Sequence, residues 1–279
     1  MAEIFGFDAY APTEIAQKVE AIGVAKARLP LRSQLALGVL AGGFIGLGAL
    51  YFTLVISDST LGFAASRLLG GVAFSLGLVL VIVAGAELFT GNNLLVMAWA
   101  SRRISTLELL YNWTVIYLAN LAGAVGLVIL VYLSNHWEMN GAAVGVQAVK
   151  IAAAKVTLTF WEAFFRGILC NILVCLAVWL ALAGRGVADK IFAVIFPISA
   201  FVAAGFEHSI ANMYFIPLGI LLKSQLAVPG AEHLSWSSFG ANLLPVTLGN
   251  IFGGAAMVAL VYYFIYQRGK TGAGSSAAK

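Results

Sequence analysis

Three ionisable side chains stand inside long apolar stretches of this sequence of 279 residues. Glu87 lies within residues 68–100, and Glu207 and His208 lie within residues 191–222. A charged group at the centre of a lipid bilayer costs at least about 2.5 to 3.5 kcal/mol on insertion scales, so ionisable residues there are candidates for function. An imidazole exchanges a proton near neutral pH, and a carboxylate accepts hydrogen bonds from backbone that has left a helix. We therefore expect His208 to act on a substrate and the two glutamates to shape the backbone beside it.

Metal and enzyme chemistry are weakly supported by the residue pattern. The Glu207-His208 pair lacks the second histidine of the H-E-x-x-H metalloprotease motif, and the sequence shows no nucleophile beside a base. The two cysteines, Cys170 and Cys175, lie five residues apart in one apolar run, where a helix turns them in different directions, and are expected to be packing residues. We predict that the protein is not an enzyme and binds no metal ion and no cofactor. An intramembrane enzyme is the rival class, and a bound zinc ion would favour it.

The composition requires helices in a membrane to position these residues. Hydrophobic residues make up 61% of the chain and charged residues 10%, and the mean hydropathy is +0.96. An ordinary soluble domain has a charged share of about 25%, so a water-soluble globule and a disordered chain are both excluded. The net charge of +4 gives no indication of nucleic-acid binding, and the lipid bilayer is the expected partner.

Hydropathy predicts an all-α membrane protein with six spans in a single transmembrane domain, residues 35–266. Four apolar runs have the length of one crossing, at residues 35–56, 109–133, 163–184 and 239–266. The runs at 68–100 and 191–222 hold 33 and 32 residues, although about 20 are enough to cross. We predict that the second and fifth spans each cross once and are broken at their ionisable residues. A long tilted helix is the simpler alternative, but it leaves the buried carboxylates without a role.

Basic residues predict the orientation and the terminal segments. Eleven Lys and Arg residues fall on the side of the two termini and four on the other side, so the positive-inside rule places both termini in the cytoplasm. Residues 1–34 are predicted to be a cytoplasmic segment in which Ile15, Val19 and Ile22 form the apolar face of a helix on the membrane surface. Residues 267–279 are predicted to be a flexible cytoplasmic tail.

An internal repeat relates the two broken spans. AGAELFTGN at residues 84–92 matches AGFEHSIAN at residues 204–212, and YLANLAGAV at residues 117–125 matches TLGNIFGGA at residues 247–255. The chain therefore reads as three spans repeated twice, and because three is odd, the second copy must enter the membrane from the opposite side. The expected architecture is two inverted three-helix repeats.

The inverted breaks predict a site that attracts an anion. The half-helices that follow the breaks point their N-terminal ends, near Asn92 and Ser209, at the membrane midplane, and such ends carry about half a positive charge. Glu87 and Glu207 occupy equivalent positions of the repeat. We expect these glutamates, with Asn92 and Asn212, to hold the breaks in shape, the carboxylates by accepting hydrogen bonds from the amides of the loops.

These motifs resemble the formate/nitrite transporter family, and its formate channels most. The likeness extends from about residue 10 to residue 266, and its most specific segments are AGAELFTGN at 84–92, GILCNILVCLAVW at 167–179, GFEHSIANMYFIPLGI at 205–220 and NLLPVTLGNIFGG at 242–254. The resemblance implies an aquaporin-like fold and a homopentamer in which each protomer carries its own anion pore. It also implies a multi-pass protein of a prokaryotic cytoplasmic (inner) membrane that conducts formate, with nitrite or hydrosulfide as alternatives.

The resemblance further implies which residues form the pore. His208 corresponds to the family's central histidine, Thr90 to its loop threonine and Lys155 to the lysine of its outer vestibule. The polar pore neighbours correspond to Asn171 and Asn250. The apolar constrictions correspond to Phe74, Leu78, Leu88 and Phe201. Without the resemblance, the helical spacing of the constriction residues would indicate ordinary packing.

The expected mechanism compensates the charge of a small anion in a low-dielectric pore. The hypothesis is that His208, with Thr90 as a hydrogen-bond donor, transiently protonates or pairs with formate or nitrite, so that transport depends on pH. The N-terminal segment is a candidate cytoplasmic lid. A neutral-solute channel of the aquaporin type is the rival within transport. The paired Asn-Pro-Ala motif of that type is absent, because Asn92 is followed by Asn and Asn212 by Met.

Overall fold

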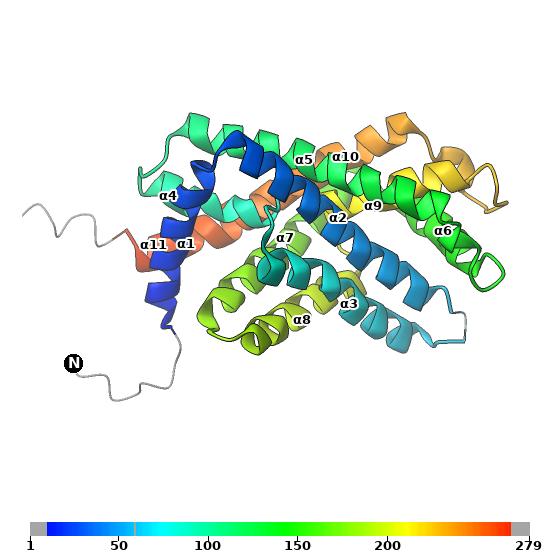
Figure 1. Cartoon of the computed structure of the whole chain (residues 1–279), viewed down its shortest axis with the longest axis horizontal. Helices are drawn as coiled ribbons and strands as arrows, with labels where there is room; N and C mark the ends of the chain where they lie inside the picture. Colours follow the sequence, from blue (N-terminus) through cyan, green and yellow to red (C-terminus); the bar gives the residue numbers. More distant parts are fainter. Residues whose placement is uncertain (1–9, 59, 269–279) are drawn as a thin grey trace, which may run out of the picture.

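The computed structural model describes residues 10–58 and 60–268, and within these ranges every regular element is a helix. The helices pack side by side in an elongated bundle (Figure 1). Six segments are long and apolar enough to cross a membrane: Leu31–Ile56, Phe63–Gly85, Thr106–Leu133, Phe160–Ala183, Val187–Ala204 and Trp236–Tyr266. The prediction of an all-α protein with six spans is confirmed. Residues 1–9 and 269–279, the ends of the two predicted terminal segments, lie outside the described residues.

The two halves of the chain contain the same order of elements. The first half contains α1 (Pro12–Ala27), α2 (Leu31–Ile56), α3 (Phe63–Val79), the π-helical turn η1 (Leu80–Gly85), the 3₁₀ turn η2 (Gly91–Leu95), α4 (Val96–Ala100) and α5 (Thr106–Leu133). The second half contains α6 (Ala143–Val156), α7 (Phe160–Ala183), α8 (Val187–Ala204), α9 (Ser209–Leu222), α10 (Trp236–Ile251), the π-helical segment η5 (Phe252–Leu260) and α11 (Val261–Tyr266). The 3₁₀ turns η3 (His136–Glu138) and η4 (Ala231–His233) lie in connecting loops. Each half thus has a short helix followed by three spans.

The second and fifth spans each consist of two helical pieces. Residues 86–90 separate η1 from η2, and residues 205–208 separate α8 from α9. Gly85 and Gly205 stand at these breaks with φ angles of +88° and +74°. Glycine adopts this region without the steric cost of a Cβ atom, so the chain can leave the helix at the same point of both repeats.

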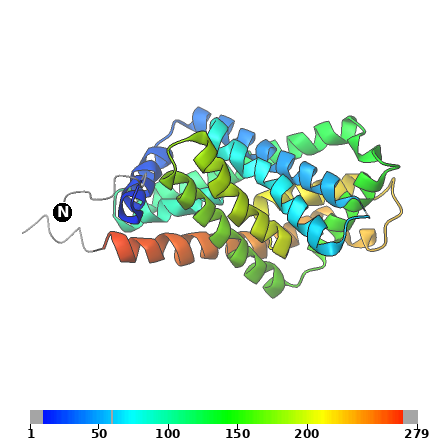
Figure 2. The ribbon, with the colours of Figure 1, turned by 90° about the horizontal axis from the view of Figure 1, so that it is seen from below.

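Small residues bring the spans into close contact, both within each half and between the halves. α2 packs along α3 and α5, α7 packs along α10, and α3 packs along α8. Figure 2 shows α2, α3 and α8 side by side. A Cβ atom on Gly42 would overlap the carbonyl oxygen of Asn120, and one on Gly249 would overlap that of Phe164. Close packing of this kind holds helices together in lipid, where apolar surface alone gives no drive to associate.

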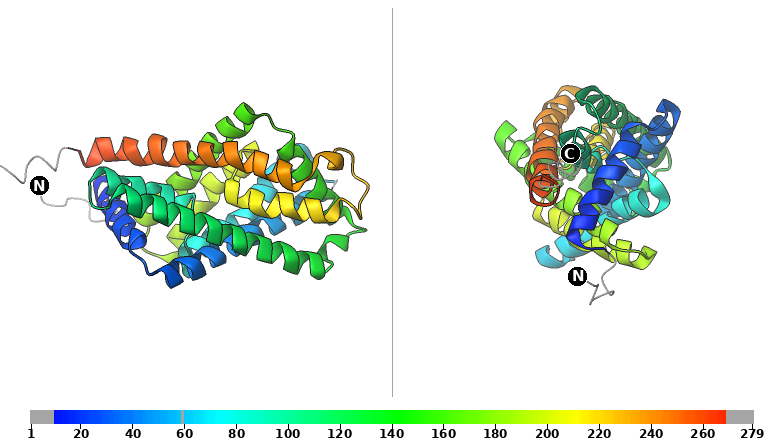
Figure 3. Two further views of the ribbon diagram at one scale, coloured as in Figure 1. Left: turned by 90° about the horizontal axis from the view of Figure 1, so that it is seen from above. Right: turned by 90° about the vertical axis from the view of Figure 1, so that its left-hand side faces the viewer.

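α1 lies across one end of the bundle, beside the C-terminal helix α11 (Figure 3). Its residues Ile15, Ala16 and Val19 are buried, and the helix packs against η2, α4 and α7. The sequence predicts that this apolar face lies on the membrane surface, and that prediction is wrong. The face covers the protein instead, because the short pieces η2 and α4 present apolar side chains, among them Leu95 and Ala98, that need a partner.

Candidate functional site

Two cavities enter the bundle from opposite ends. The first, called the α6 vestibule, has a volume of about 280 Å³ and is lined by residues of α2, α3, α6, α7, α8 and α9 and by the break at residues 205–208. The second, called the α1 vestibule, has a volume of about 490 Å³ and lies beside α1, η1 and the break at residues 86–90. His208 lines the α6 vestibule and Leu88 lines the α1 vestibule. The two cavities therefore end on either side of the two helix breaks.

His208 and Thr90 meet between these cavities. The Nε2 atom of His208 lies 2.9 Å from Oγ1 of Thr90, and the two residues are 2% and 0% exposed. The other ring nitrogen, Nδ1, accepts the backbone N–H of Ala211 at 3.0 Å and thereby caps α9. A nitrogen that accepts a hydrogen bond carries no proton, so the neutral ring holds its proton on Nε2 and donates it to Thr90. The hydroxyl of Thr90 keeps its own proton for a further acceptor.

Apolar side chains enclose this pair on both sides. Phe74 and Phe201 line the α6 vestibule, and their rings meet edge to face with centroids 5.6 Å apart. The ring of Phe201 also stacks on His208 at 5.9 Å. Leu78 and Leu88 are buried and line the α1 vestibule. The four residues expected to form constrictions thus lie two on each side, and an ion that reaches the pair must leave its water behind.

Lys155 forms a closed polar network with the second break. Its Nζ atom lies 2.9 Å from Oε1 of Glu207, whose Oε2 accepts a hydrogen bond from Nδ2 of Asn212 at 2.7 Å. Asn212 also donates to Oδ1 of Asn242 at 2.8 Å, and Asn242 donates to the carbonyl oxygen of Lys155 at 2.9 Å. Lys155 lines the α6 vestibule, and its charge is paired with that of Glu207.

The first break carries an equivalent network. The Nζ atom of Lys26 lies 2.9 Å from Oε1 of Glu87, and Nδ2 of Asn92 donates to Oε2 of Glu87 at 2.8 Å. Asn92 also donates to Oδ1 of Asn112 at 3.0 Å, and Asn112 donates to the carbonyl oxygen of Lys26 at 3.2 Å. One lysine, one glutamate and two asparagines therefore form the same chain of bonds beside each break, and the first network adds a bond from Nζ of Lys26 to Oδ1 of Asn92 at 3.0 Å.

Three members of these networks, Lys26, Asn112 and Asn242, are not among the site residues predicted from the sequence. The signal that identifies them is spacing, since Lys26 precedes Lys155 by 129 residues and Asn112 precedes Asn242 by 130. The two motif matches are offset by 120 and 130 residues, and the halves otherwise differ. Asn112 and Asn242 share the offset of 130 residues that the second motif match defines, and the offset between Lys26 and Lys155 differs from it by one residue.

Two asparagines, and not the glutamates, hold the backbone of the breaks. Oδ1 of Asn120 accepts the N–H of Phe89 at 2.9 Å, and Oδ1 of Asn250 accepts the N–H of Ser209 at 2.9 Å. Their Nδ2 groups donate to carbonyl oxygens of the same loops, both at 2.9 Å. The expectation that the carboxylates accept loop amides is therefore wrong. Each carboxylate has a lysine ammonium 2.9 Å away instead, and a charge-assisted bond to it is stronger than a bond to a neutral amide.

Asn171 ties the first break to Asn250 of α10, the residue that holds the backbone of the second break. Its Nδ2 donates to the carbonyl oxygens of Thr90 and Asn250, at 3.2 Å and 2.7 Å. Asn171 and Asn250 are fully buried and line neither vestibule. The resemblance implies that both are polar neighbours of the pore. In the structure they hold the backbone around the His208–Thr90 pair. Among residues 10–58 and 60–268, no three His, Cys, Asp or Glu side chains gather as metal ligands.

The fold and the site define a class of protein: a six-span membrane transport protein built from two repeats, with vestibules that end at a buried polar pair. The model of the formate/nitrite transporter family matches residues 13–264, and the chain belongs to this family. The relatives with assigned roles are channels and transporters, which confirms the prediction that the chain is not an enzyme.

Individual relatives cover nearly the whole chain. The formate channel FocA of Escherichia coli (strain K12) is 42% identical in an alignment of 275 residues that covers 94% of this chain and 96% of that protein. A probable formate transporter of Methanothermobacter thermautotrophicus is 40% identical over 92% of this chain and 97% of its own length. A solved pentameric formate channel with formate bound superimposes with a TM-score of 0.79 at 40% identity, covering 85% of this chain and 97% of that one. The structural likeness confirms the predicted fold.

Proposed function

We propose that this chain is a channel for a small monovalent anion, formate in the first place, and that it works as a homopentamer in which each protomer has its own pore. The observation that carries the proposal is the buried His208–Thr90 pair, enclosed by four apolar side chains between two vestibules. The formate channels among the relatives support formate as the substrate, and the solved neighbour, itself pentameric, supports the pentamer. Nitrite and hydrosulfide are the alternatives, because both are also small monovalent anions.

The membrane and the orientation belong to the same proposal. We place the protein in a prokaryotic inner membrane with both termini in the cytoplasm. The excess of basic residues on the side of the termini supports this orientation. The α1 vestibule then opens to the cytoplasm and the α6 vestibule to the outside.

The proposed path joins the two vestibules past His208 and Thr90. α9 begins at Ser209, directly after His208, so the positive end of its dipole faces the place of the anion. The Nε2–H group of His208 and the hydroxyl of Thr90 are two donors whose heavy atoms lie 2.9 Å apart. A carboxylate has two oxygens and can accept one charge-assisted hydrogen bond from each donor. These two bonds replace the hydrogen bond between His208 and Thr90.

The hydrogen bond that caps α9 determines the role of His208. A second proton on the ring would have to occupy Nδ1, which accepts the N–H of Ala211. A doubly protonated ring therefore costs the cap, whereas the neutral ring donates from Nε2 without any change. His208 thus pairs with the anion as a neutral donor. The substrate itself takes up a proton from the vestibule, and its loss of charge lowers the cost of passing the apolar residues. Acid on the side from which the substrate enters raises the fraction of neutral substrate, so flux from that side rises as pH falls.

Formate uptake into proteoliposomes at two external pH values tests the role of His208. His208→Asn keeps an acceptor for the N–H of Ala211 and removes the Nε2 donor, and His233→Asn, in an exposed loop, is the matched control. We expect His208→Asn to lower flux by about tenfold or more, because a hydrogen bond to a charged group contributes about 1.5 to 3 kcal/mol. The control should match the wild type. An unchanged rate in His208→Asn would contradict the proposal.

Two further measurements separate the alternatives. Uptake of labelled formate and labelled nitrite, each at the same two pH values, ranks the substrates, and faster nitrite uptake would replace formate in the proposal. Osmotic water flux through the purified protein distinguishes an anion channel from a neutral-solute channel. A high water flux without formate uptake would favour the latter.

We further propose that α1 is a lid on the α1 vestibule. Val19, Gly23 and Lys26 of α1 line that cavity, and Lys26 is anchored to Glu87. Deletion of residues 1–28 is expected to change the ratio of formate flux in the two directions. Lys26→Met breaks the anchoring ion pair and keeps the helix, so it separates the contribution of the anchor from that of the rest of α1. An unaltered ratio after the deletion would dismiss the lid.

A further inference from the structure

The two vestibules are built from equivalent positions of the repeat, but their charges differ. The backbone N–H of Glu87 donates to the carbonyl oxygen of Leu37 at 3.2 Å, and that of Glu207 donates to the carbonyl oxygen of Arg166 at 3.3 Å. Leu37 lines the α1 vestibule and Arg166, 129 residues later, lines the α6 vestibule. The same position beside the break thus carries an apolar side chain at one end of the molecule and a guanidinium group at the other.

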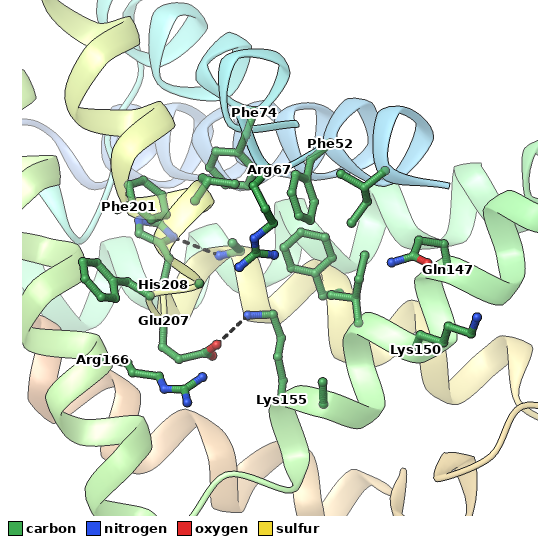
Figure 4. A pocket seen from close by; sticks show the side chains of 18 residues that line it. Phe52, Arg67, Phe74, Gln147, Lys150, Lys155, Arg166, Phe201, Glu207 and His208 are labelled. Atoms are coloured by element: carbon green, nitrogen blue, oxygen red, sulfur yellow. Dashed lines mark hydrogen bonds and ion pairs between the residues drawn. The ribbon is translucent and has the colours of Figure 1, made fainter. Parts of the chain in front are cut away.

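A second guanidinium group, that of Arg67, reaches the α6 vestibule from α3. Its Nε atom donates to the carbonyl oxygen of Ala203 at 2.9 Å, at the C-terminal end of α8. Its Nη2 atom lies beside Gly205, where a Cβ atom would approach it to 2.8 Å. The two terminal nitrogens make no hydrogen bond with any residue that the structure describes, and Figure 4 shows them inside the cavity near Lys155. They are available to a ligand.

Positive charge in the α6 vestibule exceeds the negative charge that could balance it. The cations that line it are Arg67, Lys150, Lys155 and Arg166, and the lining carboxylate is Glu207. Glu207 is paired with Lys155. Glu162, four residues before Arg166 on α7, interacts with Arg166 electrostatically but does not line the cavity, and no carboxylate of the described residues lies within 4 Å of Arg67, Lys150 or Arg166. In the α1 vestibule the Lys26–Glu87 pair is joined by one further cation, Lys190. The excess is therefore three charges in the α6 vestibule and one in the α1 vestibule.

We propose that the α6 vestibule is a binding site for a divalent oxyanion, of the class of sulfate, hydrogen phosphate and short dicarboxylates, held by the guanidinium groups of Arg67 and Arg166 with the exposed Lys150 beside them. Guanidinium groups suit such ligands because their N–H groups form paired, charge-assisted bonds with oxyanions. The cavity of about 280 Å³ has room for an ion of this size with part of its water. Two charges interact with the unpaired cations twice as strongly as one, so the site prefers a dianion to a monoanion.

A dianion bound at this site blocks the path instead of passing along it. Phe74 and Phe201 close the inner end of the cavity, and removing water from two charges costs far more than removing it from one. The bound dianion therefore competes with monoanions that enter from the α6 side. This block rests on the proposed function, whereas the binding itself does not.

Calorimetric titration of the purified full chain with sulfate, in detergent and at constant ionic strength, tests the site. Arg166 is exposed, so Arg166→Gln should not disturb the fold, and Arg102→Gln, in an exposed loop away from both vestibules, is the matched control. We expect Arg166→Gln to weaken sulfate binding by about tenfold, the effect of losing one charge-assisted contact. Arg102→Gln should leave it unchanged. Equal affinity in the wild type and Arg166→Gln, or binding of sulfate no stronger than that of chloride, would overturn the proposal.

Formate flux into proteoliposomes with sulfate on both sides tests the block. Each variant is compared with its own flux without sulfate. Sulfate should inhibit the wild type and the control Arg102→Gln, and Arg166→Gln should lose most of the inhibition. Sulfate that binds in the titration and leaves wild-type flux unchanged would overturn the block. Absence of formate flux without sulfate would contradict the proposed function instead, and the titration would still decide whether the site exists.

Discussion

His208 uses its two ring nitrogens for different purposes, and substitutions can separate them. Nδ1 caps α9 through the N–H of Ala211, and Nε2 faces Thr90. We predict that His208→Phe loses both functions, with a loss of about 0.5 to 2 kcal/mol of stability for the missing cap, whereas His208→Asn loses only the Nε2 donor. Thermal unfolding of the two variants in detergent measures the difference. A lower midpoint for His208→Asn than for His208→Phe would show that the cap contributes nothing.

The two lysine–glutamate pairs share their chemistry and differ in burial. The side chains of Lys155 and Glu207 are 13% and 5% exposed, and those of Lys26 and Glu87 are 28% and 7% exposed. Water screens an ion pair less as it becomes more buried. We predict that double-mutant cycles with Lys→Met and Glu→Gln give the larger coupling energy for Lys155–Glu207. Glu207→Gln alone should cost about 3 to 5 kcal/mol of unfolding free energy, because it leaves a buried charge unpaired. Equal coupling energies in the two cycles would mean that burial does not determine the strength of these ion pairs.

At the scale of the element, the two helix breaks begin at glycines whose surroundings differ. A Cβ atom in the left-handed region costs about 1 to 2 kcal/mol, and both Gly85 and Gly205 have positive φ. At Gly205 the added atom would also meet Nη2 of Arg67 at 2.8 Å, whereas at Gly85 it would meet nothing within 4 Å. We therefore predict that Gly205→Ala destabilises the protein more than Gly85→Ala, as measured by unfolding in detergent. Adding Arg67→Ala should remove part of the difference, and equal losses in the two single variants would contradict the prediction.

The broken spans are predictable from the sequence because length and charge point to the same places. Runs of 33 and 32 apolar residues are too long for one straight crossing, and a carboxylate within each marks where the backbone leaves the helix. The partners of these carboxylates are not predictable in the same way. Lys26 and Lys155 lie on α1 and α6, short helices whose positions depend on tertiary packing. Likewise, the amphipathic pattern of α1 shows that one face of the helix is covered. It does not show whether lipid or protein covers that face.

At the scale of the whole molecule, the two halves share one fold, but the charged residues that line their vestibules differ. Both halves use the same lysine, glutamate and asparagine network at their breaks. The halves differ at positions whose side chains take no part in this network, such as Leu37 and Arg166. The carbonyl oxygens of these two residues accept equivalent backbone bonds, so their side chains can differ. The backbone can thus remain symmetric while the two mouths of the pore acquire different potentials.

This asymmetry predicts that formate uptake responds to salt differently at the two ends. Raising the ionic strength from 0.01 M to 0.15 M shortens the Debye length from about 30 Å to about 8 Å, which weakens attraction by exposed charges. The α6 vestibule has three cations without an acidic partner and the α1 vestibule has one beyond its ion pair, so uptake through the α6 vestibule should slow more. Initial formate uptake into right-side-out and inside-out membrane vesicles, with chloride as the added salt, measures the two directions. Arg166→Gln should reduce the difference between them, and the control Arg102→Gln should not. Equal salt dependence in both vesicle types would show that the charges lining the vestibules do not govern uptake.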